Sequence, residues 1–384
     1  MDNLFFTDEH IMIRDMVREF ADTEITPVAR DLDEQGEFPT ALVNKMGELG
    51  LMGILIPEEY GGSGLDMVAF ATAIIELARA DASVAITMAA HTSLGSLPIL
   101  MFGSEEQKNT YLPKLATGEM LGAFGLTEPD AGSDAGATKT KAVRDGDEYV
   151  VNGGKIFITN AGKAGVLSFT SQVIENGKNL GIAAFSISTN TPGLEIGPKE
   201  KKMGWRASDT RQLFFKDMRI QATSMLGTPA NGFKTFLKTL TSGRVSIGAL
   251  SIGTALGAYE RALAYSTERI AFGKPINNFQ SIGFKLADMA TKIEASKLLV
   301  FHAAWMKDQG LDITKEAAMA KLFASETAME VTTEAIQIHG GYGYVKEYDV
   351  ERFFRDAKIL EIGEGTSEIQ RLIISREILK EIQI

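Results

Sequence analysis

The spacing of apolar residues changes twice along the chain, and this constrains the fold more than any other feature of the sequence. Up to about residue 115 the apolar residues recur every three or four positions, as in the runs 11–20 and 67–78, which predicts helices. From about 116 to 225 short runs rich in β-branched and aromatic residues alternate with Gly, Asn and Asp, which predicts strands and turns. Helical spacing then returns over 232–267, 278–309 and 313–338.

These changes predict an α+β protein. We expect a helical N-terminal domain over 1–115, an antiparallel β-sheet domain over 116–227 and a helical C-terminal domain over 228–384. Within the middle region, Asp145-Gly146 and Asn152-Gly153-Gly154 predict turns between strands. Thr7 and Asp8 are both candidates to cap the first helix.

The composition excludes several classes of function. The chain has 39 Lys+Arg against 50 Asp+Glu, a net charge of −11, and no basic run, so we expect no nucleic-acid partner. It contains no cysteine, which excludes disulfides, thiolate metal sites and a cysteine nucleophile. The sequence has no P-loop, dinucleotide-binding or nucleophile-elbow motif. The four histidines are far apart in sequence, so we expect no metal site.

The longest uncharged stretch, residues 82–104, is long enough to span a bilayer. It is diluted by His91, Ser96 and Pro98 among others, so we expect a buried helix followed by a proline-broken turn, and no integral membrane segment. The acidic N-terminus lacks the pattern of a signal peptide. We expect a bacterial cytoplasmic protein or, as the alternative, one of the mitochondrial matrix.

Five polar, glycine-rich segments lie between the apolar elements. Each alone has an ordinary explanation: a tight loop, a strand end, a helix–loop–helix connection, a helix C-terminus or a capped helix start. They are LTEPDAGSDAG (126–136), KIFITNAG (155–162), RIAFGKPINNFQ (269–280), QIHGGYGY (337–344) and EIGEGTSEIQR (361–371). Their order and separations are more informative than any one of them.

With LIPEEYGG (55–62), MGWRASDT (203–210) and FFKDMRI (214–220), these segments resemble the acyl-CoA dehydrogenase family over essentially the whole chain. The likeness is to its short-chain, butyryl-CoA dehydrogenase-like branch. It implies a C-terminal four-helix bundle, and FAD held between the sheet and the C-terminal helices. It also implies conversion of an acyl-CoA to trans-2-enoyl-CoA, with electrons passed to an electron-transfer flavoprotein. The implied assembly is a homotetramer, a dimer of dimers.

The resemblance also assigns roles to residues. Glu364 corresponds to the base that removes the α-proton, while a hydride leaves the β-carbon for the flavin. Positions that correspond to contacts with FAD are Phe124, Leu126, Thr127, Ser133, Phe157, Ile158 and Thr159, and Thr366 and Glu368 match positions around its adenosine end. Positions that reach the FAD of a neighbouring subunit are Arg269, Phe272, Gln280, Gln337, Gly340 and Gly341. Substrate-binding positions are Ser133, Leu240, Arg244, Gly363, Glu364 and Gly365.

Some positions depart from the family pattern. Gly363 stands where the short-chain branch usually carries Tyr, and Thr241 where many relatives have Asp. Because a missing phenol side chain widens the acyl pocket, Gly363 predicts branched, cyclic or aromatic acyl groups beside short linear ones. Some relatives supply the base just before the residue matching Arg244, but Thr241, Ser242 and Gly243 are not acidic. A glutaryl-CoA enzyme is disfavoured because 82–104 holds no Lys or Arg.

Two alternatives keep the fold but change the function. The protein could be an enoyl-CoA reductase or an acyl-CoA oxidase, although oxidases carry a further C-terminal domain that 384 residues cannot hold. It could also be a non-enzymatic binding protein, against which the retention of Glu364, Arg269 and Gln337 argues.

Overall fold

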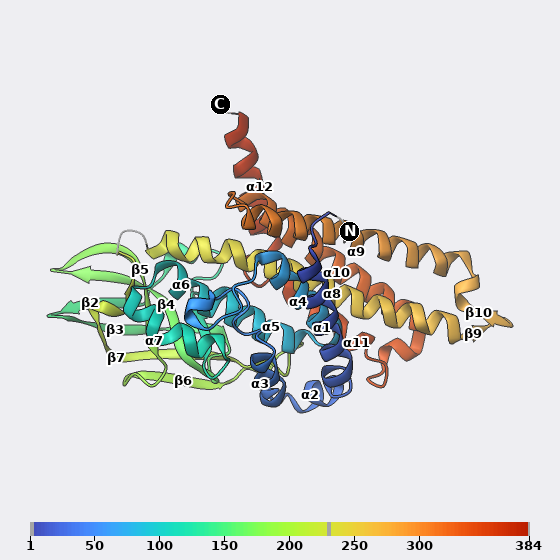
Figure 1. The fold of residues 1–384 in the computed structure, drawn as a ribbon, viewed down its shortest axis with the longest axis horizontal. Coiled ribbons are helices and arrows are strands. Elements are labelled where there is room, and N and C mark those ends of the chain that lie inside the picture. Colours follow the sequence, from blue (N-terminus) through green and yellow to red (C-terminus); the bar gives the residue numbers. More distant parts are fainter. Residues whose placement is uncertain (1–3, 229–231, 383–384) are drawn as a thin grey trace.

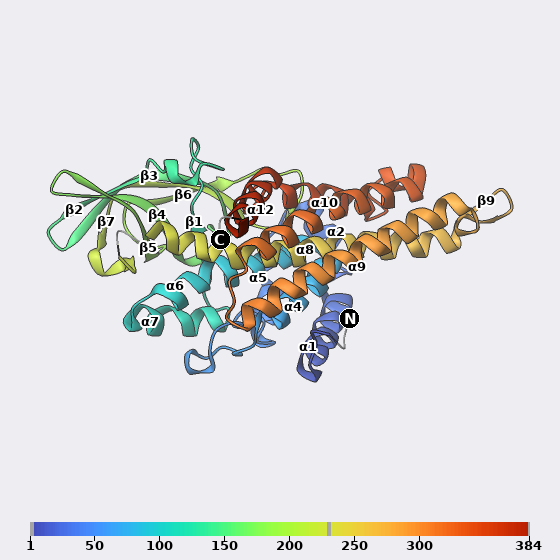
Figure 2. The same ribbon diagram turned by 90° about the horizontal axis from the view of Figure 1, so that it is seen from above.

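A computed structural model describes residues 4–228 and 232–382, without the side chains of 234–236. Helices come first, a sheet follows and helices return, which confirms the predicted order (Figure 1). The sheet lies at one end of the molecule, and the long helices of the C-terminal part run from it to the opposite end (Figures 1 and 2). The last helix projects away from the body (Figure 1).

The N-terminal part is built from short helices around the buried helices α4 and α5. Its elements are α1 (Asp8–Phe20), η1 (Ala21–Ile25), α2 (Ala29–Gln35), α3 (Thr40–Glu48), η2 (Glu58–Tyr60), α4 (Met67–Ala80), α5 (Ala82–Ala90), η3 (His91–Ser96), α6 (Leu97–Phe102) and α7 (Glu105–Ala116). Thr7 caps α1 as predicted, since its side chain accepts from the backbone N–H of His10.

The segment Ala82–Phe102 meets the length and hydropathy requirements of a membrane span, but 83% of its most apolar window is buried inside the protein. The prediction of a buried helix is confirmed, while the proline-broken turn is wrong. Pro98 lies in the first turn of α6, directly after the π-helical turn η3, and the helix continues from Ala82 to Phe102.

The middle part forms one sheet, with strands in the order β6-β7-β3-β2-β4-β5-β8 and β1 beside β4. Its elements are β1 (Leu121–Gly125), η4 (Ala135–Ala137), β2 (Lys141–Asp145), β3 (Glu148–Thr159), β4 (Ala164–Glu175), β5 (Lys178–Ser188), β6 (Leu194–Lys199), β7 (Thr210–Gln221), η5 (Ala222–Ser224) and β8 (Met225–Leu226). The sheet is mixed rather than purely antiparallel, because β1 and β2 both pair in parallel with β4.

One predicted turn is confirmed and the other is wrong. Gly146 has φ +62° in the turn between β2 and β3, as Asp145-Gly146 predicted. Asn152-Gly153-Gly154 instead lies inside β3, where the pairing with β7 shifts at Gly153. A Cβ at Gly153 would lie 2.5 Å from the hydroxyl of Thr140, so this glycine allows a close approach inside the sheet.

The C-terminal part is a helix bundle. Its elements are α8 (Gly232–Glu268), β9 (Ile270–Ala271), β10 (Lys274–Pro275), η7 (Ile276–Asn278), α9 (Gln280–Asp308), α10 (Thr314–His339), η8 (Gly340–Tyr344), α11 (Val350–Ala357), η9 (Lys358–Glu361) and α12 (Ser367–Ile382). Helices α8, α9 and α10 pack on one another, α4 packs on α8 and α9, and α12 packs on α10. One apolar core therefore joins both helical parts.

Candidate active site

Glu364 lies in a short loop between η9 and α12. Its φ is +53°, and that of the following Gly365 is +95°, so two consecutive residues adopt positive φ. Such a backbone costs a residue with a side chain about 1–3 kcal/mol, and it persists only where the surroundings hold it. The loop is joined to α12 through Gln370, whose side-chain amide donates to the carbonyls of Glu364 (3.3 Å) and Gly365 (2.8 Å).

The carboxyl of Glu364 points at α8. A Cβ built on Gly243 would lie 1.9 Å from Oε2 of Glu364, so only a glycine at this position leaves room for the carboxyl. The same Cβ would lie 3.4 Å from Cδ2 of Leu94, so η3 also approaches this point. The structure thus brings together segments more than 100 residues apart in the sequence.

The surroundings of Glu364 favour its neutral form. Oε2 is buried and has no hydrogen-bond partner among the described residues, and burial raises the pKa of Glu364 to about 7. The positive charges of Lys321 on α10 and Arg244 on α8 act in the opposite direction. Arg244 is itself buried, and its Nε has no partner within the described part of the chain. A carboxyl with a pKa near neutrality can accept a proton at physiological pH.

An apolar cluster lies next to this carboxyl. Phe124, from β1, belongs to it together with Leu94, Leu126 and Leu240. Gly363 adds no side chain, and a Cβ there would meet only the carbonyl of Ile359, at 3.4 Å. The cluster can therefore surround a small apolar group close to Glu364.

The edge of β3 presents an exposed aromatic ring. Phe157 has φ +61° and is 63% exposed, at a point where the pairing of β3 with β7 is interrupted. Ile158 is buried in the core of the sheet, so only its backbone is available to a ligand. The N–H of Ile156 donates to the carbonyl of Thr127 (2.9 Å), which joins this edge to the segment 126–136. Thr159 is partly buried and Ser133 is exposed.

A buried lysine holds these two segments together. Nζ of Lys155 donates to the carbonyl of Leu126 (3.1 Å), to Oε1 of Glu128 (2.7 Å) and to the hydroxyl of Thr170 (3.2 Å). Glu128 also accepts from the backbone N–H groups of Lys139 and Thr140. Burial lowers the pKa of Lys155 to about 8. The pKa of the buried Glu128 is lowered, because the charge of Lys155 and its hydrogen bond outweigh the effect of burial.

A second group of predicted residues lies at the opposite end of the helices. Arg269 follows the C-terminus of α8, roughly 40 Å along the helix from Gly243. It lines a cavity of about 560 Å³ together with Gly340, Gly341, Tyr265 and Tyr342. Its guanidinium lies 5.5 Å from the centre of the Tyr342 ring. Gln280, Gln337 and Phe272 nearby in the chain are exposed, Phe272 by 95%.

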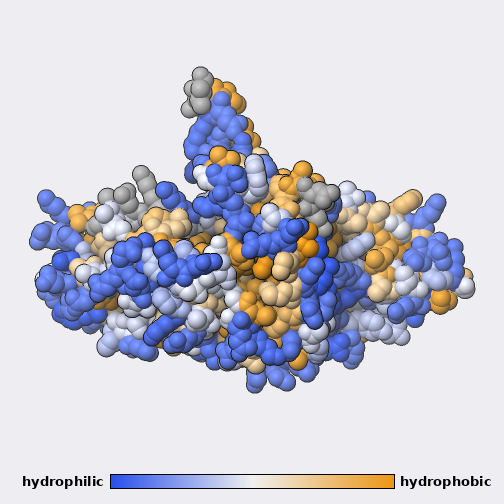
Figure 3. Space-filling model, viewed as in Figure 1, coloured by the Kyte–Doolittle hydropathy of each residue, from blue (hydrophilic) through white to orange (hydrophobic). Residues whose placement is uncertain are grey.

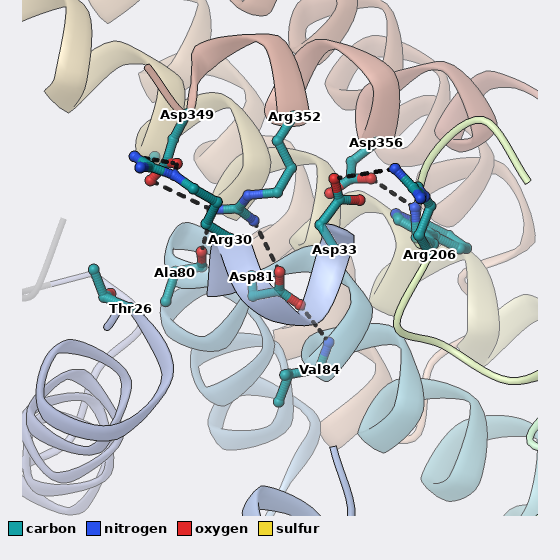
Figure 4. A network of polar contacts seen from close by, with 12 residues as sticks. Thr26, Arg30, Asp33, Ala80, Asp81, Val84, Arg206, Asp349, Arg352 and Asp356 are labelled. Carbon is teal, nitrogen blue, oxygen red and sulfur yellow. Dashed lines mark hydrogen bonds and ion pairs between the residues drawn. The ribbon is translucent and has the colours of Figure 1, made fainter. Parts of the chain in front are cut away.

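The residues before the Glu364 loop are fixed by a buried ionic network (Figure 4). Arg352 on α11 donates to Oδ2 of Asp81 (2.8 Å), and Asp356 accepts from the backbone N–H of Trp205 (2.6 Å). Arg355 pairs with Asp33 on α2 (2.6 Å). The network joins α11 to the N-terminal helices and to the 203–210 segment. Burial and the nearby Asp81 raise the pKa of Asp356 to about 7.

Several residues of the site were not found by sequence reasoning. Lys321, Gln370 and Lys155 belong to it, and Gly243 was considered only for not being acidic. A lone lysine inside an apolar run, as in AAMAKLFA and GGKIFIT, is the one signal that the sequence carries for Lys321 and Lys155. Of the predicted residues, Phe124, Leu126, Leu240, Arg244 and Glu364 come together. Thr366 caps α12, since its hydroxyl accepts from the N–H of Ile369 (3.4 Å).

Three family models match the chain. They are the N-terminal domain of acyl-CoA dehydrogenase over residues 7–119, the middle domain over 123–218 and the C-terminal domain over 230–379. "Probable acyl-CoA dehydrogenase YngJ" of Bacillus subtilis is 54% identical over 380 residues, 98% of this chain and 100% of that protein. "Acyl-CoA dehydrogenase, short-chain specific" of Clostridium acetobutylicum is 47% identical over 97% of this chain and 99% of its own length. "Acryloyl-CoA reductase (NADH)" of Anaerotignum propionicum is 47% identical over 97% and 95%.

Several solved structures are also similar to this chain. A chain described under "Electron transferring flavoprotein of Acidaminococcus fermentans" matches with a TM-score of 0.95 and 46% identity, over 97% of this chain and 98% of that one. Butyryl-CoA dehydrogenase from Megasphaera elsdenii matches with a TM-score of 0.94 and 44% identity over the same shares. An acyl-CoA dehydrogenase from Bacillus anthracis, solved with FAD, has a TM-score of 0.93 and 38% identity, over 98% of this chain and 69% of that one.

Proposed function

Because the chain belongs to the acyl-CoA dehydrogenase family, as an FAD-dependent enzyme of the short-chain type, we propose that Glu364 removes the α-proton of its thioester substrate. The observation that carries this proposal is Oε2 of Glu364, which is buried, has no hydrogen-bond partner among the described residues and occupies the space that Gly243 leaves open. Its pKa, raised to about 7 by burial, suits a group that must accept a weakly acidic proton.

The backbone of the same residue is available for the second part of the reaction. Negative charge develops on the thioester oxygen as the α-proton leaves, and donors already in place stabilise it. The N–H of Glu364 donates to no other group that the structure describes. We assign this N–H to the thioester oxygen, so that one residue places both the base and a donor.

The residues present fit FAD. Phe157 offers an exposed aromatic surface on a distorted strand edge, beside the segment of Leu126 and Thr127. Arg269, which lines a cavity with Gly340 and Gly341, offers the cation that binds a pyrophosphate by charge-assisted hydrogen bonds. When bound, FAD supplies the acceptor for the hydride that leaves the β-carbon.

The two groups of cofactor residues belong to different sites in the assembled protein. Arg269 follows α8 at the end of the long helices that lies away from the sheet, whereas Phe157 belongs to the sheet (Figures 1 and 2), so Arg269 would complete the site of a neighbouring copy. Exposed apolar side chains near Arg269, among them Phe272 (95%) and Tyr344 (88%), would be covered by that copy. Figure 3 shows further apolar residues along the projecting α12, where Leu379 and Ile382 are exposed. We therefore propose a homotetramer, a dimer of dimers.

The acyl group is proposed to be short-chain, or branched, cyclic or aromatic. Gly363 directly precedes Glu364. It is not one of the described glycines with positive φ, so its backbone conformation would also suit a residue with a side chain. A Cβ at Gly363 would meet only the carbonyl of Ile359, at 3.4 Å, so a side chain could begin there, and we propose that its absence widens the space for the acyl group. The apolar cluster of Leu94, Phe124 and Leu240 would enclose that group.

The electron acceptor is proposed to be an electron-transfer flavoprotein, which the similarity to a chain described under that name supports. The relative named as an NADH-dependent acryloyl-CoA reductase favours a second candidate, reduction of an enoyl-CoA at the same site. An oxidase is a further alternative. Bacterial relatives at about half identity support a place in the bacterial cytoplasm, with the mitochondrial matrix as the alternative.

Anaerobic titration of the purified holoenzyme with a panel of acyl-CoA thioesters tests the proposal. Linear C4 and cyclohexanecarboxyl thioesters should both bleach the long-wavelength flavin band, and enoyl-CoA should form in equal amount. If no thioester bleaches the flavin, the proposed reaction is wrong. If only linear thioesters do, the role of Gly363 is wrong. Hydrogen peroxide formation under air would identify an oxidase. Consumption of NADH in the presence of an enoyl-CoA and the electron-transfer flavoprotein would identify a reductase.

A further inference from the structure

The loop that carries Glu364 is held by groups outside it. Lys321 lies in the first half of α10, and its side chain is fully buried. Its Nζ donates to the carbonyl of Gly365, at 2.8 Å. Burying an ammonium group costs several kcal/mol, so a lysine is an unfavourable choice at this position unless its charge or its hydrogen bond is needed.

The carbonyl of Gly365 receives two donors from different helices. One is Nζ of Lys321 on α10, and the other is the side-chain amide of Gln370 on α12. Both act on the turn in which Glu364 and Gly365 have positive φ. This turn aims the carboxyl of Glu364 at Gly243, so the two donors fix the direction of the carboxyl.

Glu364 and Lys321 are surrounded by charged groups of different sign. Glu364 is influenced by Lys321 from α10 and by Arg244 from α8, both cations. The groups that influence Lys321 are Glu364, Glu361 of η9, Glu326 of its own helix and Arg244 of α8. Burial lowers the pKa of Lys321 to about 8, so it is still mostly protonated at pH 7.

We propose that Lys321 is the positioning residue of the Glu364 loop, and that its ammonium group both orients this loop and keeps the carboxyl ionised before it receives the α-proton. The inference rests on the proposed function of Glu364. Lys321 touches neither reacting atom. It acts through the carbonyl of Gly365 and through its charge, which is why its effect is measurable as a change in pH dependence.

Three variants of the holoenzyme separate these effects. Lys321→Met removes donor and charge, Lys321→Gln removes the charge and keeps a donor, and Lys321→Arg keeps both. We expect the acid limb of kcat/KM against pH to move up by about one unit in Lys321→Met and Lys321→Gln, because an opposite charge has been lost. At pH values below this limb, kcat/KM then falls roughly tenfold. Lys321→Arg should keep the acid limb of the wild type.

Controls identify a purely structural role. Lys315→Met removes a partly exposed lysine of the same helix and should leave the pH profile unchanged. FAD content and Tm are measured for every variant, and if Lys321→Met does not fold, Lys321→Gln carries the same test. Unchanged acid limbs in Lys321→Gln, with Glu364→Gln inactive, would refute the role of Lys321 alone. Retained activity in Glu364→Gln would refute the proposed function, and this inference with it.

Discussion

Adding one methyl group at Gly243 should inactivate the enzyme without unfolding it. A Cβ there would lie 1.9 Å from Oε2 of Glu364, whereas ordinary contacts begin at 3.4 Å. The other atoms that it would approach, Cδ of Glu364 and Cδ2 of Leu94, also belong to side chains. The methyl group is therefore accommodated by movement of the carboxyl, by about 1.5 Å, and a displacement of this size costs about 10²-fold in rate.

The expected effect on stability has the opposite sign. Gly243 lies inside α8, and replacing a glycine by alanine in a helix interior is favourable by roughly 0.5–1 kcal/mol. Gly243→Ala should therefore keep or raise Tm and retain FAD, while the rate of flavin reduction by a C4 thioester falls about 10²-fold. Gly283→Ala is the matched control, because its methyl group would enter open space on α9. A Gly243→Ala enzyme with full activity, or one that loses stability, would refute the reasoning.

Three further predictions address other parts of the structure. Burial raises the pKa of Asp356 to about 7, above its value in the unfolded chain, so the wild type should lose stability as pH rises from about 4 to 7. Asp356→Asn should lose less stability over this range, and urea midpoints measured at several pH values test this. Lys155→Met removes the ion-pair partner of the buried Glu128, so it should cost about 3–5 kcal/mol in the free energy of unfolding, measured by urea unfolding. The variant should also release FAD more readily, measured by flavin fluorescence. Gly363→Tyr should lower kcat/KM for a cyclohexanecarboxyl thioester by roughly tenfold or more and leave that for the C4 thioester within twofold.

The helices were predictable because their periodicity is local. The three long helices start and end within about two residues of the expected positions, and the turn at Asp145-Gly146 is where the sequence places it. The turn predicted at Asn152-Gly153-Gly154 failed because the same glycines serve a different purpose, the approach of Thr140 inside a strand. Local sequence does not distinguish a glycine in a turn from one in a bulge.

The parallel pairing of β1 and β2 with β4 could not be predicted for a related reason. The direction of pairing depends on which strands, far apart in the sequence, lie side by side. Side chains alternate along a strand in both parallel and antiparallel pairs, so the alternation does not reveal the direction. The four-helix bundle and the flavin site came from the resemblance to a family and not from periodicity.

The candidate site was only partly predictable. Glu364, Arg244 and the apolar residues around them follow from family likeness, but the position of the carboxyl depends on Gly243, which lies 121 residues earlier in the chain. Lys321 and Lys155 act through backbone carbonyls of Gly365 and Leu126, and such contacts leave no pattern in the sequence of the accepting segment.

The most direct test of the account compares Glu364→Gln with Glu361→Gln. The two glutamates are three residues apart, but Glu361 forms an ion pair with Lys358 at the surface side of the same segment (2.6 Å). Under anaerobic conditions, the rate of flavin reduction by a C4 thioester should fall by about 10³-fold or more in Glu364→Gln, and Glu361→Gln should stay near the wild-type rate. A Glu364→Gln enzyme that reduces its flavin within tenfold of the wild-type rate would contradict the assignment of Glu364 as the base.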